Sequence, residues 1–267
     1  MNEVTPTPQS PDASLSIGQK LIRILTSPAE VFQTIRSGIS WRDWVIPFVV
    51  VVAVSGVAGI LNAPYTLEFS QQAIRAQQKR FLQREMPQEQ RQQMEQRFEQ
   101  QIQKQADRYT PPQLYYLSFT GVAIRIALVL FVLAALYYFG GNTILGGKAA
   151  FPQLLALVSL PQMVTVLESV YNTLIMHLKG SAEVPASLAV LLPYGATDLF
   201  RVERYQQALF TLLSQINVFT VWRLILFAIG FGVIYQVSKA KAGGVVFGYW
   251  VLWLILTTAG AFMFAGL

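Results

Sequence analysis

The chain of 267 residues contains no cysteine and a single histidine, His177. The absence of cysteine excludes disulfides, thiol catalysis and thiolate-bound metals. Catalytic proton transfer relies most often on histidine, whereas a lone histidine at the end of an apolar segment is far more often structural. The sequence also lacks an HExxH helix, a phosphate-binding loop and a GxGxxG turn. We therefore expect no catalytic, cofactor-binding or metal-binding residues, and a protein that is not an enzyme.

Charged residues are also scarce, at 13% of the chain, while 53% of the residues are hydrophobic. The apolar residues gather in blocks long enough to cross a hydrocarbon layer of about 30 Å. Because every backbone polar group inside lipid must be paired within its own segment, these blocks predict helices. The predicted fold class is therefore all-α, a polytopic membrane protein with about five transmembrane helices, a helical extramembrane hairpin and interfacial helices.

The net charge of +6 would raise nucleic acid as a partner for a soluble chain. Here the basic residues are dispersed over loops and helix ends, without an aromatic-interleaved basic stripe. Retention at an anionic lipid surface explains them more simply, so we expect the lipid bilayer and no nucleic acid as a partner.

The organisation of the chain follows from its composition. Residues 1–14 contain three prolines and predict a disordered tail, and residues 15–44 predict interfacial amphipathic helices. The second of these helices is expected to begin at Ser27, with Glu30 placed to reach back to that cap. The first transmembrane helix is predicted at residues 45–62. Residues 114–267 predict a four-helix transmembrane region, with spans near 117–139, 151–175, 218–237 and 243–267 and an interfacial segment at 181–215 that contains a helix capped by Asp198.

The polar insertion at residues 63–113 has a different character. Between residues 66 and 110 it is glutamine-rich, with eight basic and six acidic side chains. Met94, Phe98 and Ile102 recur at four-residue spacing, which predicts a helical hairpin turning near Met86 and Pro87. The hairpin is either a partner-binding element or a solvated spacer, and the sequence leaves both readings open.

Three charged residues lie inside apolar segments: Arg125, Glu168 and Arg223. Ionisable groups there are costly and usually paired. Counted from the same side of the membrane, all three lie roughly 8 to 12 Å deep at 1.5 Å per residue. We therefore predict a buried charge cluster in which Glu168 pairs with Arg125, Arg223 or both. Such a cluster is either a structural ion pair that fixes helix register, which we favour, or a site for an anionic headgroup or small anion.

Pro161 in the third span predicts a kink, and Gly230, Gly243 and Gly244 indicate close helix packing.

The orientation follows from the short loops, which carry Lys148, Lys239 and Lys241. By the positive-inside rule these loops and the N-terminus are cytoplasmic, and the C-terminus is extracytoplasmic. The polar insertion alone holds more basic residues than the N-terminal tail and would favour the opposite orientation. We give the short loops more weight, because acidic residues largely match the basic ones of the insertion.

The order of elements resembles the Yip domain family. The resemblance rests on an LxxPxxxFxxI-like stretch, five spans, a late W-x3-L-x3-G segment and a Ser-Lys-Ala-x-Ala turn; the residues are Leu25, Pro28, Phe32, Ile35, Trp222, Leu226, Gly230 and Ser238 to Ala242. Eukaryotic members interact with Rab-type GTPases at vesicle membranes, and this chain is more similar to the bacterial branch, for which no GTPase partner is implied.

The resemblance implies no enzymatic activity. We expect a membrane scaffold or adaptor in the cell (inner) membrane that binds a membrane-protein partner or lipids; a homo-oligomer also remains open. The alternative is a subunit of a transport system with an anion- or lipid-binding site inside the membrane.

Overall fold

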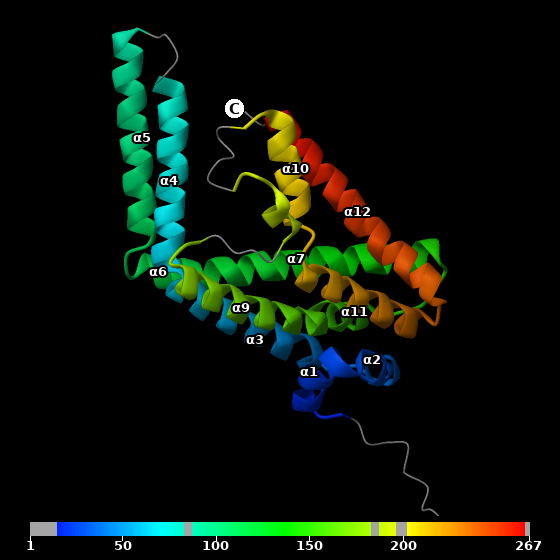
Figure 1. The fold of residues 1–267 in the computed structure, drawn as a ribbon. Helices are drawn as coiled ribbons and strands as arrows, with labels where there is room; N and C mark the ends of the chain where they lie inside the picture. The colour runs from blue at the N-terminus through cyan, green and yellow to red at the C-terminus, as the bar shows by residue number, and fades with distance from the viewer. Residues whose placement is uncertain (1–14, 83–86, 183–186, 196–201, 265–267) are drawn as a thin grey trace, which may run out of the picture.

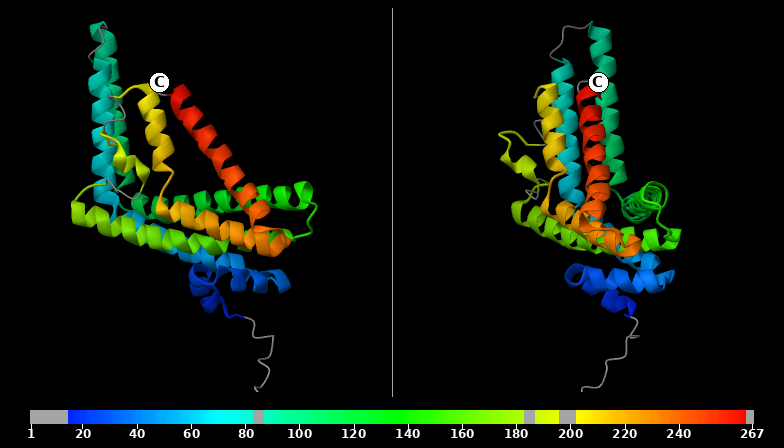
Figure 2. Two further views of the ribbon diagram at one scale, coloured as in Figure 1. Left: turned by 45° about the vertical axis from the view of Figure 1, so that its right-hand side comes forward. Right: turned by 90° about the vertical axis from the view of Figure 1, so that its right-hand side faces the viewer.

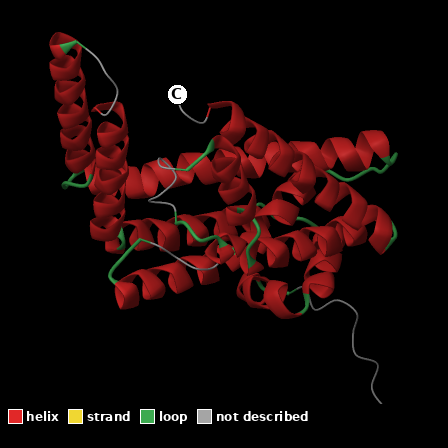
Figure 3. Cartoon of the chain, turned by 45° about the horizontal axis from the view of Figure 1, so that its top comes forward, coloured by secondary structure: helices red, strands yellow, loops and turns green. Residues whose placement is uncertain are grey.

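The structure, a computed structural model, describes residues 15–82, 87–182, 187–195 and 202–264. Helices account for all regular secondary structure in this part of the chain, apart from one isolated bridge between Ser187 and Asn217 (Figure 3). The all-α fold class predicted from the sequence is confirmed. The expected disordered tail at residues 1–14 lies outside the described residues.

Five helical segments are long and apolar enough to cross a membrane. The first, fourth and fifth are single helices: α3 (Arg42–Leu61), α11 (Val218–Tyr235) and α12 (Lys239–Phe264). The second runs through α6 (Gln113–Tyr116), η1 (Leu117–Gly121), α7 (Val122–Tyr138) and η2 (Phe139–Ile144). The third runs through α8 (Phe151–Ser159), η3 (Leu160–Gln162) and α9 (Met163–Lys179). The protein is therefore a polytopic membrane protein.

The axes of the first four spans are roughly aligned with one another, and the last span is inclined to them. In Figure 1 and in the left view of Figure 2, α3, α7, α9 and α11 run along one another, whereas α12 leans away from them. We call the end of this bundle at which α11 ends and α12 begins the basic end, because Lys148 lies in the loop before α8, and Lys239 and Lys241 lie in the first turn of α12. The opposite end, where α3 ends and the polar hairpin begins, is the hairpin end.

The irregular turns within the spans have local causes. The break predicted at Pro161 is present, because Leu160–Gln162 form a 3-10 turn between α8 and α9. The second span has a π-helical turn at each end, and the one at the basic end contains Gly141. A Cβ at Gly141 would stand 1.9 Å from the Tyr235 ring, so the missing side chain lets that ring lie against the helix.

Two short helices precede the spans, α1 (Ile17–Thr26) and α2 (Pro28–Ser37). Ser27 does precede α2, but its side chain makes no capping hydrogen bond. Glu30 instead forms an ion pair with Arg23. The expected capping contact between Glu30 and Ser27 is therefore wrong, because the charged donor on α1 takes the carboxylate. In Figure 1 α2 is seen almost end-on, so it lies crosswise to the spans.

The largest group of buried residues joins these short helices to the spans. Ile24, Val31, Phe32 and Ile35 are completely buried and belong to the same core as Leu157 and Phe231. Burying a large aliphatic or aromatic side chain contributes about 1.5 to 3 kcal/mol. Helices α1 and α2 are thus an integral part of the bundle at the basic end.

The polar insertion forms two antiparallel helices, α4 (Ala63–Leu82) and α5 (Gln88–Arg108). Phe98 is buried and its stripe neighbours Met94 and Ile102 are half-buried, so the apolar stripe lies in the seam between the helices. The predicted turn near Met86 falls partly on residues 83–86, which lie outside the described residues. The views of Figure 2 agree that the pair stands crosswise to α3 and α9.

Between the third and fourth spans the structure describes a 3-10 turn, η4 (Leu188–Leu191), and α10 (Arg204–Ser214). The predicted helix cap Asp198 lies outside the described residues. Helix α10 packs along α12 through its buried Ala208, while Tyr205 and Leu209 on another face are exposed. This arrangement leaves an apolar face of α10 open to lipid.

Candidate functional site

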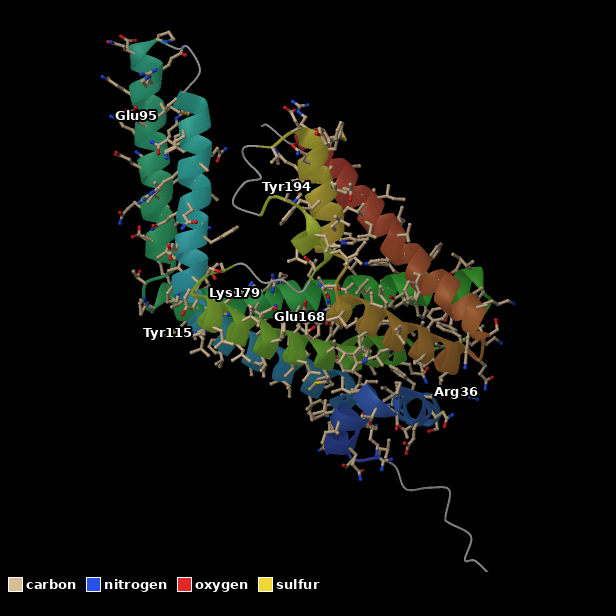
Figure 4. The ribbon with its side chains drawn as sticks, in the orientation of Figure 1. Arg36, Glu95, Tyr115, Glu168, Lys179 and Tyr194 are labelled. Atoms are coloured by element: carbon tan, nitrogen blue, oxygen red, sulfur yellow. The ribbon has the colours of Figure 1, made fainter. Side chains whose placement is uncertain are left out.

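Glu168 and Arg223 meet in the interior of the bundle. Glu168 lies on α9 and Arg223 on α11, and the distance from Oε2 of Glu168 to Nη1 of Arg223 is 3.5 Å. The same guanidinium nitrogen donates a hydrogen bond of 2.7 Å to the Thr165 hydroxyl, and the other terminal nitrogen donates one of 3.3 Å to the Thr220 hydroxyl. Figure 4 shows Glu168 midway along the bundle, far from both ends. These contacts hold the guanidinium between two helices.

Arg125 is placed elsewhere. Its side chain is exposed on α7, and it has no ion pair or hydrogen bond with any residue that the structure describes. Helix α7 packs mainly on α8 and α3, so its Arg125 face turns away from the other two charges. Of the three residues considered together in the sequence, the structure brings together Glu168 and Arg223.

The ion pair belongs to a longer polar stripe on α9 that sequence reasoning missed. Ser169 lies 3.5 Å from Ser55 of α3, oxygen to oxygen, and Thr173 accepts a hydrogen bond of 3.0 Å from Asn62. The signal was available, since polar residues recur along the third span at helical spacing. The polar groups of α9 therefore connect the third span to both the first and the fourth.

A second ion pair, also missed, lies at the basic end. Lys20 of α1 contacts Asp43 of α3 at 2.7 Å, and their side chains are only 10% and 3% exposed. Asp43 also accepts a hydrogen bond from the backbone N–H of Ser40 and lies in the first turn of α3, where the helix dipole favours a negative charge. The sequence signal is that Lys20 stands on the apolar stripe with Ile17 and Ile24. The pair fixes α1 to the first span.

The residues most often used in catalysis do not gather here. His177 is exposed, its Nδ1 lies 2.8 Å from the carbonyl oxygen of Thr173, and its ring stands edge-on to Tyr65. In the part of the chain that the structure describes, no three histidine or acidic side chains are placed to hold a metal ion. The contacts of His177 join α9 to the start of α4.

Two sequence segments far apart in the chain converge at Gly230. A Cβ at this position would stand 2.4 Å from Leu157 and 2.6 Å from the Phe32 ring, so only glycine allows α2 and α8 to approach α11 this closely. Phe32 comes from the LxxPxxxFxxI-like stretch and Gly230 from the W-x3-L-x3-G segment. A comparison with protein-family models matches residues 22–261 to the Yip1 domain. The chain belongs to the Yip1 domain family.

The match to the Yip1 domain spans both segments and the polar hairpin between them. Comparisons with curated proteins and with solved structures found no match. The family relationship therefore identifies a Yip1 membrane protein. The two segments on which the resemblance rested form one packed contact at the basic end.

Proposed function

We propose that this Yip1 protein is a non-enzymatic scaffold or adaptor that binds another membrane protein through its polar hairpin. The observation that carries the proposal is the surface of α5. Its apolar side chains are used in the seam with α4, and the remaining faces carry exposed glutamine, arginine and glutamate side chains, including Gln92, Gln96 and Gln100. Polar side chains of this kind offer many hydrogen bonds to a partner and little to lipid.

The direction of the hairpin favours a partner in the same membrane. Because α4 and α5 stand crosswise to α3 and α9 (Figure 1), the pair would run parallel to the plane of a bilayer that these spans cross. A helix pair in this position presents its side to neighbouring membrane proteins, just outside the hydrocarbon. A merely solvated spacer needs no apolar seam, whereas the buried Phe98 makes the pair a defined element.

We further propose that the protein resides in the cell (inner) membrane of a bacterium. The two short connections at the basic end, including the first turn of α12, carry three lysines, which supports a cytoplasmic N-terminus under the positive-inside rule. Five spans then place the C-terminus and the hairpin on the extracytoplasmic side. The partner would accordingly be recognised outside the cytoplasm.

The test is site-specific photocrosslinking in living cells. A photoreactive amino acid at exposed Gln96 or Gln100 of α5 is expected to yield a discrete protein adduct. The same amino acid at Leu174, which is exposed on α9 within the third span, serves as the control and is expected to crosslink mainly to lipid. No protein adduct at several exposed positions of α5, in cells where the protein is inserted and stable, would overturn the proposal.

A second candidate is a subunit of a transport system, favoured by the polar stripe on α9. The side-chain oxygens of Asn62 and Asn172 are buried without a hydrogen-bond partner, beside a stripe that includes Glu168. Such acceptors would be satisfied by water entering between the spans. Accessibility of a cysteine at Asn172 to a membrane-impermeant thiol reagent would support this candidate, and complete protection from the reagent would count against it.

A further inference from the structure

The basic end carries a concentration of positive charge from segments far apart in the chain. Arg36 lies in the last turn of α2, Lys148 lies in the loop before α8, and Lys239 and Lys241 lie in the first turn of α12. All four side chains are exposed. Figure 4 places Arg36 at the opposite end of the bundle from Tyr115 and Lys179. The positive charges therefore share one end of the molecule.

Contacts between their supporting elements bring these residues into one neighbourhood. The Gln153 side chain of α8 donates hydrogen bonds to the backbone oxygens of Ile35 and Arg36, each at 3.2 Å. With its side-chain oxygen facing the guanidinium, Gln236 at the end of α11 accepts hydrogen bonds from Arg36. The Tyr235 ring lies directly against Gly147, the residue before Lys148. The C-terminus of α2, the Lys148 loop and the turn between α11 and α12 thus adjoin one another.

The two acidic residues that the structure describes at this end are already paired. Glu30 binds Arg23, and Asp43 is buried with Lys20. Among the residues that the structure describes, no carboxylate forms an ion pair with Arg36, Lys148, Lys239 or Lys241. The exposed charges of the cluster are therefore available to an external anion, and the end of the spans corresponds to the headgroup level of a bilayer.

The helix below the cluster has room for an acyl chain. Lys241, Gly244 and Gly248 follow one another along one face of α12, at spacings of three and four residues. A Cβ at Gly244 or Gly248 would meet nothing within 4 Å. The close packing predicted at Gly243 and Gly244 is therefore absent, since Gly243 also faces open space. Farther along the face, the exposed Val251 and Ile255 provide apolar surface.

We propose that the basic end binds the phosphate headgroup of an anionic phospholipid, with Arg36, Lys148, Lys239 and Lys241 holding the headgroup and the glycine face of α12 accommodating an acyl chain. Arg36 supplies a planar group with several donors, of which Gln236 uses only part. The lysines supply charge that adapts to the headgroup. This site is independent of the hairpin and of the partner that the hairpin would bind.

The test measures lipid binding to the purified full-length protein by native mass spectrometry in a mild detergent. The probes are phosphatidylglycerol, phosphatidylcholine and, separately, inorganic phosphate. The test variant combines Lys148→Gln, Lys239→Gln and Lys241→Gln. A matched control removes three exposed lysines of the hairpin end with the same change in net charge; it combines Lys79→Gln, Lys104→Gln and Lys179→Gln.

The expected result is a preference of the unchanged protein for phosphatidylglycerol over phosphatidylcholine. Each basic residue near a membrane surface contributes about a fivefold factor to the affinity for an anionic lipid. Loss of three lysines should therefore lower the affinity of the test variant for phosphatidylglycerol roughly a hundredfold. The affinity of the control variant should change little. The double substitution Gly244→Leu and Gly248→Leu is expected to weaken the binding of phosphatidylglycerol but not the binding of inorganic phosphate. This difference separates the acyl-chain contact from the phosphate contact.

Equal loss in the two triple-lysine variants, or equal binding of the two lipids by the unchanged protein, would overturn the proposal. Binding of inorganic phosphate as tight as that of phosphatidylglycerol would also overturn it, since the site would then recognise a free anion.

Discussion

The buried ion pair between Lys20 and Asp43 predicts that Asp43→Ala releases α1 from the first span. Removing one partner of a buried pair leaves an uncompensated charge and costs on the order of 3 to 5 kcal/mol. Since about 1.4 kcal/mol corresponds to a tenfold change in an equilibrium constant, the open population of α1 should rise between about a hundredfold and a few thousandfold.

The absence of cysteine provides the assay. Ile24, on the inner face of α1, is completely buried, so a single Ile24→Cys substitution creates a thiol that reacts with a maleimide only when α1 opens. The labelling rate should rise with the open population in the Asp43→Ala variant. Replacing both partners by apolar residues, as Lys20→Met with Asp43→Leu, should restore most of the protection.

The exposed pair between Arg23 and Glu30 is the matched control. These side chains are 42% and 48% exposed, and a surface pair contributes only about 0 to 1 kcal/mol. Glu30→Ala should therefore accelerate labelling by no more than about fivefold. If Asp43→Ala and Glu30→Ala accelerate labelling equally, burial does not set the strength of the Lys20 pair and the reasoning fails.

Three further predictions concern the packing of the spans. Gly230→Leu should expose the same reporter thiol, because overpacking costs about 1 to 3 kcal/mol and here forces α2 away from α11; unchanged protection would contradict the close contact. The double variant Glu168→Arg with Arg223→Glu should have a melting temperature closer to that of the unchanged protein than either single variant has, with a coupling energy of about 1 to 2 kcal/mol. Additive losses of stability would exclude the pair. Gly141→Val should lower the melting temperature in detergent by several degrees, whereas Gly121→Ala, which enters open space, should not.

The positions of the spans could be predicted because they depend on local rules. A run of apolar residues in lipid must satisfy its own backbone hydrogen bonds, so its length and composition determine a helix. The predicted first span began at Val45 and the helix begins at Arg42, since Asp43 finds its partner and is tolerated in the first turn. The hairpin stripe of Met94, Phe98 and Ile102 was likewise readable, because four-residue spacing puts the three side chains on one face.

The partners of the charged residues could not be predicted in the same way. Counting residues along each span gives the depth of a side chain in the membrane, and it places Arg125, Glu168 and Arg223 at a similar level. Which side chains meet also depends on the rotation of each helix and on its neighbours. Helix α7 packs on α8 and α3, so Arg125 faces outward although counting residues gives it a similar depth.

The sequence by itself determined an all-α membrane protein of five spans, the break at Pro161 and the two-helix hairpin, because each of these follows from hydrogen bonding and periodicity within a short segment. Tertiary structure alone decided the crosswise direction of the hairpin, the pairing of Lys20 with Asp43 and the gathering of Arg36 with the loop lysines. These contacts join segments many residues apart, and their energies depend on how the helices pack against one another, a property that no single segment carries.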